Sequence, residues 1–135
     1  MAILSEQIYK LIRTELFNAG LTAYSDKMPD EKLYPFVVYS IDDIINKPDL
    51  GFNKEYEHIP VKFYIYGDKT NPHDVIDIAE QIETIFNRTK KTFVDTTNGK
   101  YLVANKKEDD DIRFLDENDY WLATTTYAFC AQRNL

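Results

Sequence analysis

The chain has 135 residues, of which 44% are hydrophobic and 29% are charged, and its formal net charge is −7. This is the length of about one domain, and the apolar content, with ten Tyr and eight Phe, is too high for an intrinsically disordered chain. The negative charge argues against tight binding to nucleic-acid phosphates, and no apolar run approaches the ~20 residues that cross a bilayer, so we expect a soluble globular domain made in the cytoplasm.

The first predicted element is an amphipathic helix over residues 3–18. Its apolar side chains recur at the spacing of one stripe on a 3.6-residue helix: Leu4, Ile8, Leu11, Ile12 and Leu16. Gly20 follows, and glycine readily adopts the left-handed conformation that ends many helices. Next we expect a short strand over 21–24 and a loop containing Pro29. Residues 36–41 are rich in β-branched and aromatic side chains, which predicts a strand.

Residues 42–57 are the least regular stretch of the sequence. They include Pro48 and Gly51, yet they also carry five large apolar side chains: Ile44, Ile45, Leu50, Phe52 and Tyr56. A surface loop with so many apolar side chains is unlike a simple connector. Either the loop folds back on its own domain or it contacts another chain, so these five residues form the predicted subunit or partner interface.

A strand and a second helix follow. Apolar residues alternate strictly over 58–66, which predicts a half-buried strand. Asn71 is then the predicted N-cap of a helix over 72–86, with Pro72 in its first turn and Asp74 near the positive end of the helix dipole. The predicted buried stripe of this helix is Val75, Ile78, Ala79, Ile82, Ile85 and Phe86.

The rest of the chain has the composition of strands. We expect strands over 92–95 and 101–104 joined by a tight turn, and a long final strand over 120–131 that is central or projecting. The order of helix, strands, helix, strands lacks the strand–helix–strand repeat of a parallel sheet. It predicts an α+β fold, a mostly antiparallel β-sheet with two α-helices packed on one face, with residues 1–135 as a single domain.

The acidic run Glu108, Asp109, Asp110 and Asp111 is a feature of this second half. A calcium loop would space its carboxylates and include a glycine, whereas here three aspartates are consecutive. We interpret the run as a solvated charged turn, with a functional acidic surface and a structural metal as the alternatives.

Catalytic motifs are absent from the sequence. His58 and His73 do not have the spacing of zinc ligands, and Cys130 has no histidine nearby in the sequence, so a buried structural cysteine is the favoured interpretation. The pair Asp42 and Asp43 is typical of a solvated turn, and the four glycines stand alone. The sequence therefore predicts no catalytic residues, no metal and no cofactor.

Three stretches together resemble the phage tail-completion family, whose members are also called tail terminator or head–tail joining proteins. They are the aromatic-Pro-aromatic-Val-Val strand over 34–42, the strand and helix over 61–82, and the closing strand over 121–129. With the first helix they span nearly the whole chain, in the family's order.

The resemblance implies a structural virion protein, assembled in the bacterial host cytoplasm, without catalysis or cofactor. Members assemble as rings, commonly hexamers, at the head-proximal end of a long tail. Such a ring ends polymerisation of the tail tube protein and joins the tail to the capsid connector or head-completion protein, and DNA passes through it without specific binding. A negative charge suits such a channel, so Glu108, Asp109, Asp110 and Asp111 are the predicted acidic surface or lumen.

Two other classes of function stay open. A small acidic inhibitor or immunity-type protein would bind a basic partner through Glu108–Asp111 and would be a monomer. An enzyme would draw first on Asp42, Asp43 and His58. Genomic neighbourhood separates these classes, because a tail-completion gene lies between the genes for the capsid connector and the tail tube.

Overall fold

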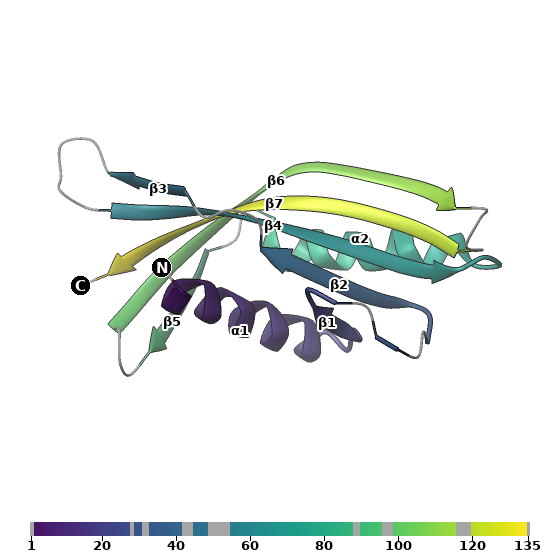
Figure 1. The fold of residues 1–135 in the computed structure, drawn as a ribbon, viewed down its shortest axis with the longest axis horizontal. Helices are drawn as coiled ribbons and strands as arrows, with labels where there is room; N and C mark the ends of the chain where they lie inside the picture. Colours follow the sequence, from purple (N-terminus) through teal and green to yellow (C-terminus); the bar gives the residue numbers. More distant parts are fainter. Residues whose placement is uncertain are drawn as a thin grey trace.

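The structure is a computed structural model of the chain, drawn in Figure 1. It describes residues 2–27, 29–30, 33–41, 45–48, 55–87, 90–95, 99–115 and 120–134. The elements in chain order are α1 (Ala2–Asn18), β1 (Ala23–Ser25), β2 (Phe36–Ile41), β3 (Ile45–Pro48), β4 (Glu55–Asp68), α2 (Pro72–Phe86), β5 (Lys90–Asp95), β6 (Gly99–Leu115) and β7 (Tyr120–Asn134).

The strands form one seven-stranded sheet in the order β1-β2-β4-β7-β6-β5, and β3 also pairs with β4. Every described pair is antiparallel except β1 with β2. The last strand, β7, lies between β4 and β6 and is therefore central, as predicted. The α+β class with a mostly antiparallel sheet is confirmed.

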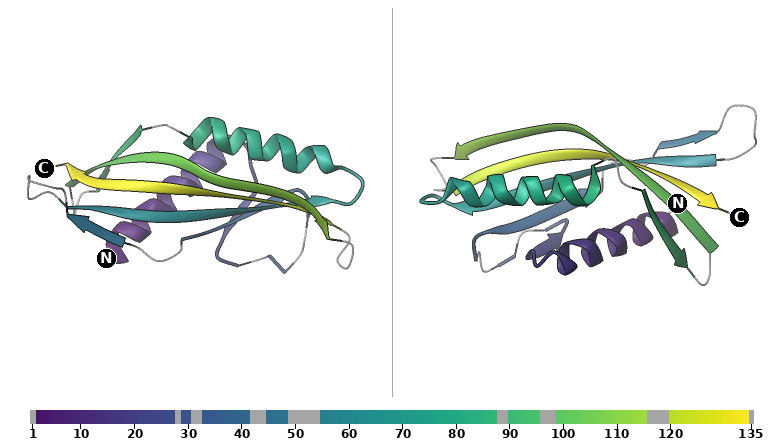
Figure 2. Two further views of the ribbon diagram at one scale, coloured as in Figure 1. Left: turned by 90° about the horizontal axis from the view of Figure 1, so that it is seen from above. Right: turned by 180° about the vertical axis from the view of Figure 1, so that it is seen from behind.

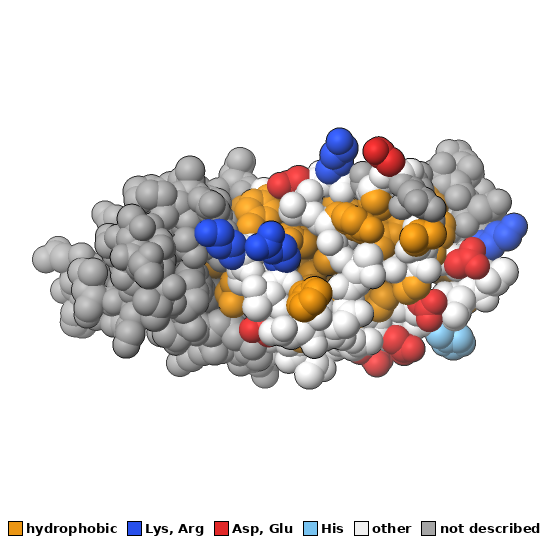
Figure 3. All heavy atoms as spheres, turned by 90° about the horizontal axis from the view of Figure 1, so that it is seen from below, with side chains coloured by type: hydrophobic (Ala, Val, Ile, Leu, Met, Phe, Trp, Pro, Cys, Tyr) orange, Lys and Arg blue, Asp and Glu red, His pale blue; other side chains and the backbone are white. Residues whose placement is uncertain are grey.

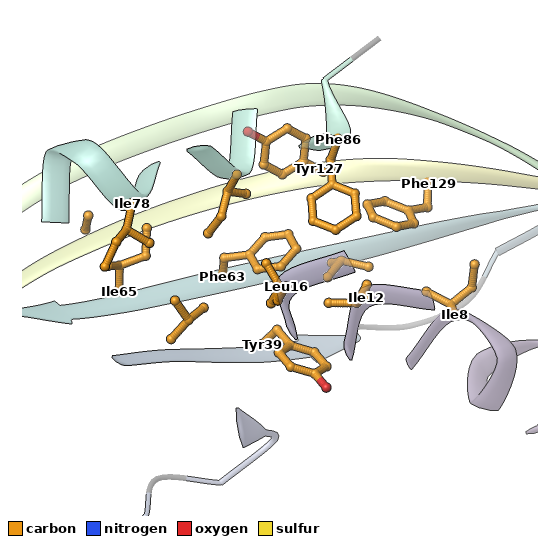
Figure 4. Close-up of a cluster of buried hydrophobic side chains, with 14 of the residues drawn as sticks. Ile8, Ile12, Leu16, Tyr39, Phe63, Ile65, Ile78, Phe86, Tyr127 and Phe129 are labelled. Atoms are coloured by element: carbon orange, nitrogen blue, oxygen red, sulfur yellow. The ribbon is translucent and has the colours of Figure 1, made fainter. Parts of the chain in front are cut away.

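Both helices pack on the same face of this sheet (Figure 2). Alternate residues of β4 point to that face and are fully buried: Ile59, Val61, Phe63 and Ile65. Figure 4 shows how side chains from both helices and from β2, β4 and β7 converge there. Phe63 lies at the centre, with its ring centroid 5.5 Å from that of Phe86 and 5.7 Å from that of Tyr127.

Helix α1 follows the predicted stripe. Ile8, Ile12 and Leu16 are fully buried against the sheet. The helix ends where the glycine predicts it, because Gly20 has a φ of +79° and the Leu21 N–H donates to the Leu16 carbonyl at 3.0 Å. This is the left-handed ending that glycine accommodates without strain.

Helix α2 also buries its predicted stripe, through Val75, Ile78, Ile82 and Phe86. Asn71 is the N-cap residue of this helix, as predicted. The side chain of Asn71 makes no capping hydrogen bond. The preceding turn is instead organised by Asp68, whose carboxylate accepts from the Lys69 N–H at 2.9 Å and from the Thr70 hydroxyl at 2.8 Å.

Two regions are more regular than the sequence predicts. The stretch 42–57 is not irregular throughout, because β3 and the start of β4 form an antiparallel hairpin. The acidic run 108–111 is not a turn, because it lies inside β6 and pairs with β7. Aspartate is unfavourable in strands, but pairing along a long central neighbour outweighs that local preference.

Candidate interaction surfaces

Two residues of the predicted partner interface fall on the β3–β4 hairpin. Ile45 pairs with His58 in the strand register, and Tyr56 pairs with Lys47, so both predicted residues belong to this hairpin. Ile44, Leu50 and Phe52 lie outside the described residues. In Figure 1 the hairpin extends past the ends of both helices. An element that projects in this way is accessible to a second molecule, and the interface remains a prediction.

The acidic run lies where β6 has no outer partner among the described strands. Strand β5 pairs with β6 only over Gly99–Ala104. Asp109 and Asp111 lie farther along β6 and pair on the inner side with Thr126 and Thr124 of β7. The register shifts between Lys107 and Asp109, which marks an irregularity in the ladder. Charged residues and bulges on an open edge are common protections against edge-to-edge aggregation. The placement therefore gives the run a structural role beside the predicted acidic surface.

No group of three or more metal-ligating side chains occurs within the part of the chain that the structure describes. Asp111 is exposed there. His58 and Cys130 are directly opposite one another on β4 and β7. Reasoning along the sequence missed this neighbourhood, because 72 positions separate two residues that only the strand register brings together. Asp42 and Asp43, the other residues an enzyme would use, lie outside the described residues.

The sheet face opposite the helices carries an aromatic cluster that the sequence did not predict. Phe36, Val38 and Tyr66 are buried there beneath five partly buried side chains: Tyr24, Tyr34, Tyr64, Tyr120 and Leu122. The rings of Phe36 and Tyr66 stack at 4.9 Å between centroids, and Tyr120 meets Tyr66 edge-on at 5.3 Å. Burial raises the pKa of Tyr66, so its hydroxyl stays protonated at neutral pH. The cluster packs one end of this face.

Farther along β7 the same face carries polar side chains. Thr124 and Thr126 of β7 are half-buried, and Asp111 lies across from Thr124 in the register. Thr126 is paired with Lys62, whose Nζ lies 5.3 Å from the ring centroid of Tyr64. Because α1 and α2 both lie on the other face, this surface of small polar side chains is the one that the helices leave uncovered.

A second polar site ties α1 to the β1–β2 end of the sheet. The Tyr9 hydroxyl donates to the Asp26 carboxylate at 2.6 Å and accepts from the Ile41 N–H at 3.3 Å. The Asp26 N–H donates to the Tyr39 carbonyl at 2.8 Å. Burial, and then the hydrogen bond to Asp26, raise the pKa of Tyr9 to about 12. These hydrogen bonds link α1 to β2 and to the turn after β1.

Figure 3 shows the molecule from below, where hydrophobic side chains lie between scattered charged ones. Two shallow depressions flank the end of α1. One, of about 450 Å³, is lined by Arg13, Phe17, Gly20, Leu21, Thr22 and Ala23. The other, of about 500 Å³, lies between the end of α1 and α2 and is lined by Ala19, Asp77, Glu80, Gln81, Thr84 and Ile85. Each is open to a partner.

Comparison with known proteins shows a likeness in fold. No family model matches the sequence. No curated protein matches it either. Among solved structures, 93% of this chain superposes on 91% of a chain from the "Virion of native gene transfer agent (GTA) particle", with a TM-score of 0.63. The two chains share a fold. Their sequences are 10% identical, so the likeness concerns architecture alone. In addition, neither helix is long and apolar enough to span a membrane over its described residues.

Proposed function

We propose that this chain is a structural component of a phage-like virion, a tail-completion protein that forms a ring, of six copies in the commonest arrangement, at the head-proximal end of a long tail. The observation that carries the proposal is the shared fold with a chain of a gene transfer agent virion, which extends over nearly the full length of both chains. The resemblance of the strand at 34–42 and of the closing strand to the tail-completion family points to the same role.

A ring subunit needs two different contact patches, because each copy meets its two neighbours through different surfaces. The projecting β3–β4 hairpin, with Ile44, Ile45, Leu50, Phe52 and Tyr56, is the surface that we assign to a neighbour or to the tail tube protein. A hairpin that extends the sheet past the helices can reach an adjacent copy without moving the core.

The uncovered sheet face is the surface that we assign to the channel. It presents half-buried threonines and the exposed carboxylate of Asp111, and this is the face opposite both helices. With that face inward, the acidic run Glu108–Asp111 lies on or beside the wall that DNA passes. Repulsion between like charges then keeps the duplex from adhering to the channel.

In this proposal the chain acts through assembly, in the virion and without catalysis or a cofactor. The ring caps the tail tube and presents its other side to the capsid connector or head-completion protein. Termination of a polymer requires only that the added ring resemble the tube subunit on one side and differ from it on the other.

Removal of the gene from its phage or prophage tests this role. Without the chain, tail tubes should be overlong and unattached to heads in electron micrographs, while heads fill normally. Addition of the purified protein to such an extract should restore joining of tails of normal length. Tails of normal length attached to heads in the absence of the chain would reject the proposal.

A further inference from the structure

The end of α1 presents an exposed aromatic side chain among cations. Phe17 is 79% exposed. Arg13 and Lys10 precede it by one and two turns on the same side of the helix, and both are exposed. Phe17 is the most exposed large apolar side chain among the described residues, so its ring is available to contact another molecule. We call Phe17 with Arg13 the knob.

The groove between α1 and α2 has the opposite charge. Its wall on α2 carries Asp77 and Glu80, both exposed, while Ala19 and Ile85 add apolar surface. The Thr84 hydroxyl donates to the Glu80 carbonyl at 3.0 Å within the helix, so it does not require a partner from outside. Helix α2 contains no lysine or arginine between Pro72 and Phe86, so no cation of its own offsets these carboxylates.

The knob and the groove lie on different sides of α1. Phe17 belongs to the depression lined by Arg13 and Gly20, whereas Ala19 belongs to the groove against α2. The two depressions share no lining residue. One copy can therefore present its knob to one neighbour while its groove receives the knob of another. This is the head-to-tail geometry of a cyclic assembly.

We infer that successive copies of this chain contact one another through these two surfaces: Phe17 of one copy seats in the α1–α2 groove of the next, and Arg13 faces Asp77 and Glu80. The occupant is a second copy because the chain itself carries both the apolar plug and the charge complementary to the groove. The inference rests on the proposed ring and names an interface within it.

Disulfide trapping tests this contact even where free rings are short-lived. In a Cys130→Ala background, one variant carries Thr14→Cys, beside the knob, and a second carries Gln81→Cys, in the groove. Both positions are exposed, and both substitutions leave Phe17, Arg13, Asp77 and Glu80 intact. Oxidation of the mixture should give a linked dimer at least several-fold more abundant than either variant gives alone.

Substitutions in the knob and in the groove locate the contact. Phe17→Ser in the Thr14→Cys variant should remove the link, and Arg13→Glu should weaken it. A partner with Asp77→Lys and Glu80→Lys should restore the link to the Arg13→Glu variant, because the charges are then exchanged. The control pair combines Thr14→Cys with Lys69→Cys, at an exposed position of the β4–α2 turn, in place of Gln81→Cys. Linking that is as efficient with Lys69→Cys, or that survives Phe17→Ser, would overturn the inference.

The result is separable from the tail function. If the wild-type protein joins tails to heads but Thr14→Cys and Gln81→Cys do not link, the ring uses other surfaces and this inference fails alone. If the two variants link but the protein does not act on tails, the contact is real and the proposed function fails.

Discussion

A Cβ atom placed on Gly67 would lie 2.6 Å from Cγ1 of Val75. Gly67 is the penultimate residue of β4, and Val75 is a fully buried residue of the first turn of α2. This close approach explains why position 67 is a glycine, although its φ does not require one. The absence of a side chain lets α2 turn back closely onto the strand that it follows, and this places the whole buried stripe of the helix against the sheet.

Gly67→Ala should therefore destabilise the protein by about 1–3 kcal/mol, the usual cost of overpacking a core. Urea unfolding followed by circular dichroism measures this. Val75→Ala combined with Gly67→Ala should cost less than the sum of the two single changes, because the smaller side chain makes room for the new methyl group. Strict additivity, or a Gly67→Ala protein as stable as wild type, would show that α2 is not seated as described.

The aromatic centre of the core gives a second prediction. Phe63 is fully buried and its ring lies within 6.4 Å of those of Tyr39, Phe86 and Tyr127. Phe63→Ala should cost about 3–5 kcal/mol through lost burial and the cavity left behind. Phe17→Ala is the matched control, since the same chemical change at an exposed position should stay within about 0.5 kcal/mol. Equal losses at the two positions would contradict the assigned burial.

The hydrogen bond between Tyr9 and Asp26 predicts a dependence on alkaline pH. The folded-state pKa of Tyr9 is about 12, above the ordinary value of 10.0, so the folded state holds this proton more tightly than the unfolded state does. The contribution is complete below pH 10 and is lost as the pH rises toward 12. Tyr9→Phe should remove one late-titrating tyrosine from the ultraviolet titration and cost about 0.5–1.5 kcal/mol at neutral pH. Unchanged late titration in Tyr9→Phe would reject the assignment.

Local patterns predicted the elements whose packing is local. The stripe Ile8, Ile12 and Leu16, the left-handed Gly20 and the alternation along β4 are all in place, because each depends on neighbours within a few residues. What failed depends on partners far along the chain. The length of β6 comes from pairing with β7, although its acidic residues alone favour a turn.

The surfaces were harder to predict than the fold. The aromatic cluster around Tyr66 joins residues from a loop and four strands, so no single segment shows it. The opposition of His58 and Cys130 likewise follows from the register of β4 and β7. The apolar residues of 42–57 were noticed as a group, but only the strand register shows that Ile45 and Tyr56 lie in a hairpin that extends the sheet.

The open outer side of β6 predicts a role for the acidic run in solubility. Replacing Asp109 and Asp111 with threonine removes two charges from an edge that no described strand covers, so aggregation should become faster. Turbidity on mild heating measures the rate of aggregation. Asp30→Asn with Asp74→Asn removes the same charge away from this edge and from the proposed groove, and is the control. If both double variants aggregate equally fast, net charge rather than edge protection is responsible.

The solution mass, measured by light scattering over a range of concentrations with and without purified tail tubes, tests the proposed ring most directly. One subunit is 15.9 kDa. The proposed ring predicts a closed species near six subunits, either free at high concentration or formed on the end of the tube. Masses should not continue to rise beyond that species. A chain that remains a monomer at every concentration and does not bind tail tubes would contradict it.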